Sequence, residues 1–122
     1  MRKPWSWIVV CVTLLFASPA FGEGKAEMKA GTGIAKREAV GAADAFTAGT
    51  KVWAWSAITG AKDSTVKHVW KKDGKVLWEK SFTVSSSRYR TWTRRSVKPG
   101  SYTVEVQAED GTVLGSVTFT VT

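Results

Sequence analysis

Apolar and polar residues alternate one by one over most of the chain after residue 50, and this period of two is typical of half-buried β-strands. The clearest run has Tyr102, Val104 and Val106 on one side and Thr103 and Glu105 on the other. Turn signals such as Asp-Gly and Pro-Gly recur about every ten residues, which favours many short strands. We therefore predict seven strands, at residues 33–37, 50–58, 65–71, 75–84, 88–97, 102–108 and 113–121.

The alternation leaves each strand with one apolar face, which must be buried against a second sheet. The predicted fold is therefore all-β: an immunoglobulin-like antiparallel β-sandwich of about seven strands. Asp73-Gly74 and Asp110-Gly111 are expected to close two hairpins, because glycine tolerates the positive φ of a tight turn. Lys80 interrupts the apolar positions of its strand, which indicates a bulge or a sheet edge there.

The first 22 residues have the pattern of a secretory signal peptide. Arg2 and Lys3 precede an apolar run at residues 5–16, and small residues follow at Ala20 and Gly22. About a dozen apolar residues are few for a membrane-spanning helix, which needs about 20, so an uncleaved anchor is only the alternative. The predicted division is a signal peptide at 1–22, a flexible tether at 23–33 and one β-sandwich domain at 34–122.

Export places the domain in a periplasmic or extracellular environment. The only cysteine, Cys11, lies in the signal peptide, so the predicted mature chain contains neither a disulfide nor a thiolate metal site. Sixteen Lys and Arg residues against ten Asp and Glu residues give that chain a net charge of +6. Outside the cytoplasm this charge favours anionic polysaccharides, peptidoglycan, lipid head groups or acidic envelope proteins over nucleic acid, although it also serves solubility alone.

The most basic stretch is RYRTWTRR at residues 88–95. Strand alternation puts Arg88, Arg90, Trp92 and Arg94 on one face, where the arginines would flank the indole. Such a face offers hydrogen-bond donors to carboxylates or phosphates beside a stacking ring. The alternative is a solvated face on which the arginine stems only cover the indole.

Trp53 and Trp55 form a second aromatic pair, two residues apart on one predicted strand. If both were exposed, indoles about 7 Å apart would form a platform on which sugar rings stack. The alternative is that at least one of the two belongs to the core, because a domain without disulfides needs large apolar anchors. Both are therefore only tentative ligand-binding residues.

His68 is the only histidine, and Val66 and Trp70 share its face of the strand. A metal site needs three or four ligands, and one histidine with scattered carboxylates does not supply them. No serine-nucleophile motif accompanies the histidine. We expect a structural histidine that packs on Trp70 with its ring nitrogens hydrogen-bonded. We expect no catalytic residues, no metal and no cofactor. Glu38 is expected to form an ion pair at the exit of the first strand.

Four short motifs stand in order along the chain: KREAVG at 36–41, HVW at 68–70, RTWT at 90–93 and GTVLGSVTFTV at 111–121. In this order and spacing they resemble the bacterial family called domain of unknown function 2914 (DUF2914), from about residue 34 to residue 121. Ala39 departs from the family pattern, which commonly has proline there. The resemblance implies a small β-sandwich, often exported or attached to a membrane protein, and it implies no reaction. The motif residues to which we assign a structural role are Arg37, Glu38, His68 and Trp70.

These patterns favour a non-catalytic exported module of the cell envelope that binds an anionic glycan or an envelope protein. The residues expected to carry the binding are Arg88, Arg90, Trp92 and Arg94, with Trp53 and Trp55 from a neighbouring strand. The second hypothesis is a structural or protein-interaction domain whose aromatic residues lie mostly in the core. A remote third hypothesis is a hydrolase centred on His68, for which the sequence shows no partner constellation.

Overall fold

The computed structural model describes residues 24–122, and all of the regular structure in this range is β-strand. The predicted signal peptide at 1–22 lies outside the described residues. Within the described range no helix is long and apolar enough to cross a membrane. The strands are β1 (Lys25–Gly31), β2 (Gly33–Ala35), β3 (Glu38–Val40), β4 (Ala45–Phe46), β5 (Lys51–Thr59), β6 (Thr65–Lys72), β7 (Lys75–Thr83), β8 (Arg88–Ser96), β9 (Gly100–Ala108) and β10 (Val113–Val121).

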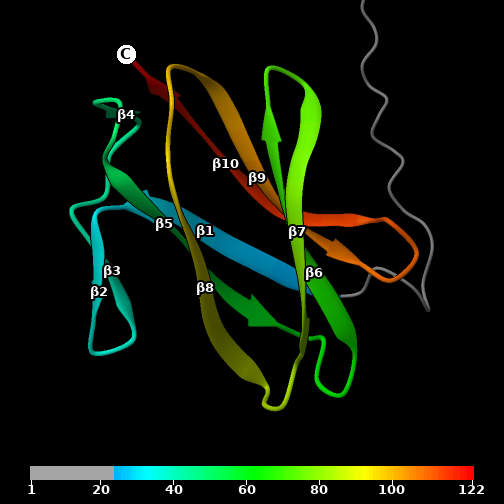
Figure 1. Cartoon of the computed structure of the whole chain (residues 1–122). Helices are drawn as coiled ribbons and strands as arrows, with labels where there is room; N and C mark the ends of the chain where they lie inside the picture. Colours follow the sequence, from blue (N-terminus) through cyan, green and yellow to red (C-terminus); the bar gives the residue numbers. More distant parts are fainter. Residues whose placement is uncertain (1–23) are drawn as a thin grey trace, which may run out of the picture.

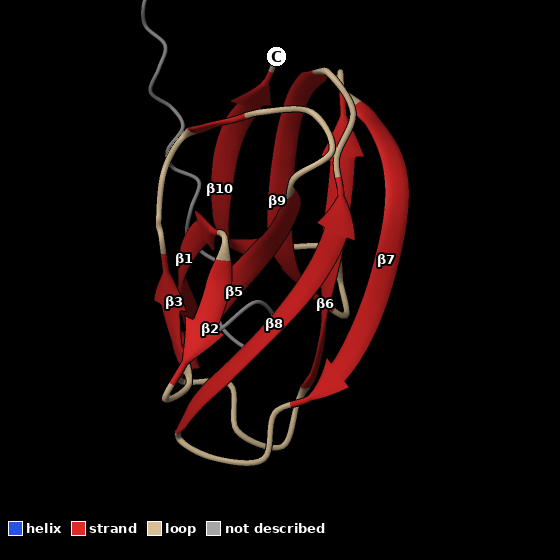
Figure 2. Cartoon of the chain, turned by 60° about the vertical axis from the view of Figure 1, so that its left-hand side comes forward, coloured by secondary structure: helices blue, strands red, loops and turns tan. Residues whose placement is uncertain are grey.

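The strands form two main sheets that pack against each other around a common core (Figures 1 and 2). The smaller sheet has the order β1-β5-β8, and the larger has the order β4-β10-β9-β6-β7. A hairpin of β2 and β3 forms a third, two-stranded sheet. Except for the short parallel pair of β4 and β10, all neighbouring strands are antiparallel. The predicted all-β sandwich is therefore confirmed.

The order of the strands is that of immunoglobulin-like sandwiches. When β1, β5, β6, β7, β8, β9 and β10 are lettered A, B, C, C′, E, F and G, the sheets become A-B-E and G-F-C-C′. Tyr102, near the start of strand F, forms the tyrosine corner of this fold, since its hydroxyl donates to the Lys98 carbonyl at 2.9 Å. Trp70 on strand C is fully buried, as is the characteristic tryptophan of the fold.

The six strands predicted after residue 50 match β5 to β10 to within two residues at each end. Both predicted glycine turns are present as well. Asp73 and Gly74 have φ of 51° and 86°, as a type I′ turn requires. Gly111, with φ of 91°, donates its amide to the Ala108 carbonyl at 2.9 Å and closes a three-residue loop. Alternation and turn chemistry therefore locate these elements correctly.

The prediction of a flexible tether at 23–33 is wrong, because Lys25–Gly31 form β1 and pair with β5 along their whole length. The inward side chains of β1 are Ala26, Met28 and Ala30. β1 passes close to β10, where a Cβ on Gly115 would collide with the Ala26 carbonyl, so glycine is required at position 115. Alanine contributes little to a hydrophobic pattern, so the alternation in this strand is weak in the sequence.

The strand predicted at 33–37 is instead the first half of the β2-β3 hairpin, so the domain has more strands than the seven predicted. Lys36 and Arg37 form the turn, with φ of 53° and 65°. This conformation is uncommon for residues other than glycine, asparagine and aspartate, so the sequence contains no turn signal at this point. The hairpin packs on the outer face of the smaller sheet, where the Trp55 indole donates to the Arg37 carbonyl at 2.8 Å.

The core lies between the two sheets and has two apolar parts. In the larger part, the Phe119 ring stacks on Tyr102 with centroids 5.1 Å apart and meets Phe46 edge-on at 5.4 Å. The smaller part includes Ile58 and Val66. A buried polar cluster separates the two parts along β5 and β6, and it includes the motif histidine.

Candidate functional site

Strand β8, which contains RYRTWTRR, divides its side chains as the alternation predicts. Thr93 points inward and is buried, whereas Trp92 and Arg94 lie on the outer face. The register with β5 places Trp92 opposite Trp55 and Arg94 opposite Trp53. Trp92 itself is half-buried. Its neighbours on the same face therefore decide which of the predicted binding residues form a site.

Trp55 is only 1% exposed although it points away from the core of the sandwich, because the β2-β3 hairpin covers it. An ion pair fastens this hairpin, with Arg90 Nη1 2.6 Å from Glu38 Oε2. The expected ion pair of Glu38 is thus present, and Arg37 contributes its main-chain carbonyl. Trp55 cannot belong to a binding surface, so its assignment as a ligand-binding residue is wrong. Arg90 has a structural role as well, because its ion pair with Glu38 holds the hairpin over Trp55.

Trp53, Trp92 and Arg94 come together in a groove at the open side of the sandwich, where β8 ends the smaller sheet and β7 ends the larger. Figure 2 shows this side, with β8 in front and β7 at the right. Thr93 from β8 and Trp78 and Lys80 from β7 also line the groove, which we call the tryptophan groove. Arg88 lies at the far end of β8, opposite Thr59, and takes no part in it.

The tryptophan groove encloses about 260 Å³. Pockets that surround a drug-sized ligand are larger, at about 300–1,000 Å³. The groove is therefore suited to hold part of a ligand, such as one ring of a chain, rather than to enclose a whole small molecule.

Two arginines lie over indoles at the groove. The guanidinium of Arg94 is 5.7 Å from the centroid of Trp53, and that of Arg95 is 5.3 Å from the centroid of Trp78. Arg90 and Arg94 flank Trp92 on the outer face as predicted, but the expected cation–π geometry is wrong, since no cation–π contact between described residues involves Trp92. The arginines of β8 instead lie over tryptophans of other strands: Arg94 over Trp53 on the paired strand β5, and Arg95 over Trp78 in the opposite sheet. None of the ion pairs in the described range includes Lys80, Arg94 or Arg95, and the side chains of Lys80 and Arg94 are exposed.

Trp78 and Lys80 are groove residues that the sequence does not single out. Their one signal is the interruption of the apolar pattern at Lys80, which indicates a bulge or a sheet edge. The structure shows the edge, whereas the bulge in the β6-β7 pairing lies at Trp70 and Lys71. An inward-pointing lysine on an edge strand also opposes pairing with the edge of another sheet. Only the packing of the two sheets brings Trp78 and Trp92 to one groove.

His68 is fully buried between the sheets, and both of its ring nitrogens are hydrogen-bonded. Its Nε2 is 2.8 Å from Ser56 Oγ, and its Nδ1 is 2.9 Å from Thr93 Oγ1. The ring was expected to pack on Trp70, but its aromatic neighbour is Phe82, which it meets edge-on with the ring centroids 5.1 Å apart. Burial lowers the pKa of His68 from 6.5 to about 4, so the ring is neutral at pH 7. The prediction of a structural, hydrogen-bonded histidine is confirmed.

The Trp70 indole only donates, and it donates to Thr93 Oγ1 at 2.8 Å. Thr93 Oγ1 keeps a second lone pair and one hydrogen, so it can donate to Nδ1 of His68 or accept from it, and the contacts fit either ring tautomer. In one tautomer Nε2 donates to Ser56 Oγ; in the other Ser56 donates to Nε2, which is the direction that a serine nucleophile needs.

Ser56 is also 0% exposed, so no substrate reaches its hydroxyl in this arrangement. The Ser56–His68 pair is a contact that the sequence does not reveal, and its geometry is that of a satisfied core network. It gives no support to the hydrolase hypothesis. That the chain has no enzymatic activity stays a prediction.

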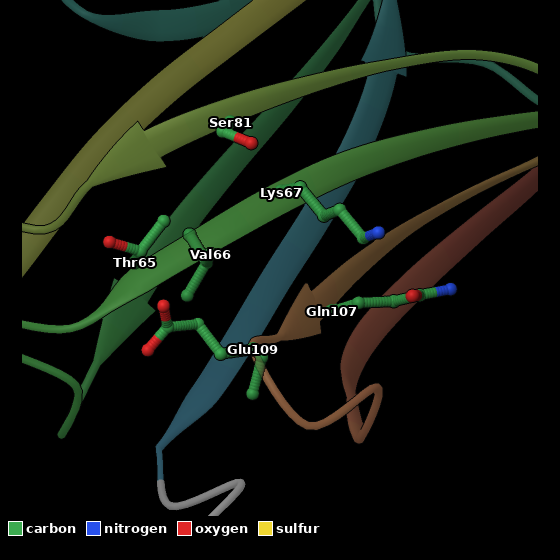
Figure 3. Close-up of a pocket in the computed structure, with 7 residues that line it drawn as sticks. Thr65, Val66, Lys67, Ser81, Gln107 and Glu109 are labelled. Atoms are coloured by element: carbon green, nitrogen blue, oxygen red, sulfur yellow. The ribbon is translucent and has the colours of Figure 1, made fainter.

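A second pocket, of about 220 Å³, lies on the larger sheet between β6, β7 and β9 (Figure 3). Hydroxyl, amide and carboxylate groups from Thr65, Ser81, Gln107 and Glu109 line it, and none of its seven lining residues is aromatic. Within residues 24–122 no group of three or more His, Cys, Asp or Glu side chains is placed to hold a metal ion. The tryptophan groove is therefore the stronger candidate, because it combines stacking rings with cations.

A protein-family model matches residues 63–121, and its description is protein of unknown function (DUF2914). The chain belongs to the DUF2914 family. The match covers β6 to β10, which include His68, Trp70 and every groove residue except Trp53. The resemblance was expected from residue 34, but the KREAVG motif at 36–41 and the β2-β3 hairpin lie before the matched region. The DUF2914 match therefore includes most of the tryptophan groove and leaves out the hairpin that covers Trp55.

No curated protein matches the chain. Among solved structures, the DUF2914 chain is similar to the Pseudomonas fluorescens alkylpurine DNA glycosylase AlkC bound to DNA containing an abasic site analog. The TM-score is 0.45 and the sequence identity is 17%. The alignment covers 81% of this chain and 30% of the glycosylase, so this chain spans less than a third of that protein. A similarity at this level indicates nothing about the ligand of the DUF2914 chain.

Proposed function

We propose that this DUF2914 chain is an exported, non-catalytic binding module of the cell envelope that holds an anionic glycan in its tryptophan groove. One observation supports the proposal above all. Three half-buried indoles from β5, β7 and β8 converge on a groove that also contains Lys80 and Arg94, and neither cation has an acidic partner among the described residues.

The residue types of the groove suit a sugar that carries an acid group. The C–H faces of sugar rings are apolar and stack on indoles, for which Trp53 and Trp92 come from one sheet and Trp78 from the other. A carboxylate on the ring would accept hydrogen bonds from Arg94 and Lys80, and such charge-assisted bonds are about twice as strong as neutral ones. The small volume of the groove fits one ring of a longer polymer.

The environment in this proposal rests on the sequence. The signal-peptide pattern at residues 1–22 supports export to the periplasm or beyond, where anionic glycans and peptidoglycan are abundant partners for a basic protein. Nucleic acid is correspondingly disfavoured.

The test is retention of the purified protein on peptidoglycan and on a polyuronate, with a neutral glucan as the reference polymer. We expect retention on an acidic polymer, and we expect Trp92→Ala and Trp78→Ala each to weaken it at least about tenfold, as truncation of an aromatic hot spot does. Leu77→Ala is the matched control, because Leu77 is exposed on the same strand as Trp78 but does not line the groove. No retention on any acidic polymer, or equal retention of all variants, would overturn the glycan proposal.

The second candidate is a protein-interaction domain, and two exposed apolar side chains on β7 favour it. Val76 and Leu77 are 56% and 44% exposed beside Trp78, and an envelope protein could bury these apolar side chains at the end of β7 away from Lys80. In that case Val76→Asp would abolish binding of a purified partner, while Trp92→Ala would leave it intact. The hypothesis that the aromatic residues are core applies to Trp55 and Trp70, which are buried.

A further inference from the structure

Charge is divided unequally between the two outer faces of the sandwich. The outward side chains of β1, β5 and β8 and of the β2-β3 hairpin, which we call the basic face, include eight basic residues against two acidic ones, a net charge of +6. The basic residues are Lys25, Lys29, Lys36, Arg37, Lys51, Arg88, Arg90 and Arg94, and the acidic ones are Glu27 and Glu38. The outward charged side chains of the larger sheet are balanced, with Lys67 and Lys71 against Glu79 and Glu105.

The two faces also differ in how their cations are paired. On the larger sheet both lysines have acidic partners, since Lys67 lies 3.1 Å from Glu79 and Lys71 lies 3.3 Å from Glu105. On the basic face only Arg90 and, at 3.9 Å, Lys29 form ion pairs. The other six cations form no ion pair with a described residue, and all six are exposed: Lys25, Lys36, Arg37, Lys51, Arg88 and Arg94.

This separation needs a reason beyond solubility. A soluble surface is served best when charges of both signs are interspersed, as they are on the larger sheet. A face of one sign raises the local concentration of a polyanion and speeds its association. The basic face carries a net charge equal to that predicted for the whole exported chain, so the rest of the domain is neutral in sum.

We infer that the basic face seats the domain on an anionic phospholipid bilayer. The cations come from three strands and from the tip of a hairpin, so they cover a face rather than a single track. A plane of head groups contacts such a face at once, whereas a linear polyanion follows a groove. Trp53 and Trp92 are half-buried on the same face, and indoles favour the level of the lipid head groups.

Binding of the basic face to a bilayer does not depend on the glycan proposal. Trp78 and Lys80 belong to the tryptophan groove and lie on β7, away from the basic face, while Lys25, Lys36 and Arg88 lie on the basic face and do not line the groove. Variants at these two sets of residues therefore separate the two functions.

The test is sedimentation of the purified protein with vesicles. We expect binding to vesicles of equal parts phosphatidylcholine and phosphatidylglycerol, and none to phosphatidylcholine alone. Binding should be lost near about 1 M salt, where the Debye length falls to about 3 Å. The triple variant Lys25→Gln, Lys36→Gln and Arg88→Gln should bind about a hundredfold more weakly, because each cation at an anionic leaflet contributes about a factor of five.

The matched control is Lys62→Gln, Lys75→Gln and Lys98→Gln, which removes the same charge from exposed positions off the basic face. It should keep vesicle binding, as should Trp78→Ala whatever becomes of glycan binding. Thermal melts check that each variant is folded. The inference is overturned if the acidic vesicles do not bind the protein, or if the two triple variants lose binding equally. Tighter binding to single-stranded DNA than to vesicles would overturn it as well, if the Lys25, Lys36 and Arg88 triple variant loses that binding, because the face would then serve a linear polyanion.

Discussion

Trp92 and Thr93 are neighbours in sequence and both line the tryptophan groove, yet their polar surroundings differ in character. Trp92 lines an open groove in which the cations have no acidic partner among the described residues. The Thr93 hydroxyl lies in a buried network in which it accepts from Trp70 and is hydrogen-bonded to Nδ1 of His68. Both regions combine a tryptophan with polar groups. What distinguishes them is whether the polar groups are satisfied within the protein.

The comparison shows how to separate structural from binding residues in a domain rich in aromatics. A buried polar group without a partner costs about 1–3 kcal/mol, so the network around His68 must be complete for the fold to be stable. Exposed cations have water as a partner, so their lack of acidic neighbours costs little and leaves them available. The following variants test this contrast, from the largest expected effect to the smallest.

Trp70→Ala should lower the free energy of unfolding by about 3–5 kcal/mol, because it leaves a cavity in the core and removes a donor from Thr93. Trp92→Ala should lower it by only about 1 kcal/mol or less, since this side chain is half-buried and the groove is open. Urea denaturation measures both. Equal losses would mean that Trp92 is part of the core after all.

Acidification should destabilise the domain through His68. The folded pKa is about 4 and the ordinary value is 6.5, so between these values the unfolded chain binds a proton that the folded chain does not. Stability therefore falls as the pH falls from 6.5 to 4, by up to about 3 kcal/mol at about 1.4 kcal/mol per pKa unit, and it is fully retained above pH 6.5.

The measurement is urea denaturation at pH 7 and at pH 4.5, for the natural protein and for His68→Phe. Carboxylates also titrate near the lower end of this window, so the difference between the two proteins is the readout. The His68→Phe protein should start less stable and show a smaller fall. Parallel falls in the two proteins would count against a buried neutral histidine.

Thr93→Val should cost about 1–3 kcal/mol although it preserves the shape of the side chain, because it leaves the Trp70 indole and the His68 ring each without a partner. Thr91→Val is the matched control. Thr91 is also buried and two residues away, but its hydroxyl forms no hydrogen bond with a described residue, so the loss should be close to zero. A comparison of chemical melts at pH 7 decides the point, and similar losses would refute the assigned network.

Much of the fold could be predicted because strand alternation and turn chemistry are local. The six strands from β5 to β10 and the turn at Asp73-Gly74 follow from neighbouring residues alone. β1 could not be predicted because two of its three inward residues are alanines, which add little to a hydrophobic pattern. The β2-β3 hairpin was missed because Lys36 and Arg37 turn the chain without glycine or asparagine.

The candidate site could be predicted only in part. Alternation identified the face of Trp92 and Arg94, and Trp53, also a candidate from the sequence, lies beside them through the pairing of β5 with β8. It could not show that a hairpin would cover Trp55, or that Trp78 and Lys80 would reach the same groove from the other sheet. The Ser56–His68 contact likewise joins strands of different sheets.

The sequence by itself determined the β class, the main strands, the side on which each side chain lies and the excess of positive charge. Those properties depend on residues one or two positions apart, and the backbone geometry of a strand transmits them directly. The tertiary structure decided which outward tryptophans stay open and which cations remain without a partner. Exposure and pairing depend on what the packing of two sheets and a hairpin brings alongside, and that is a property of distant segments.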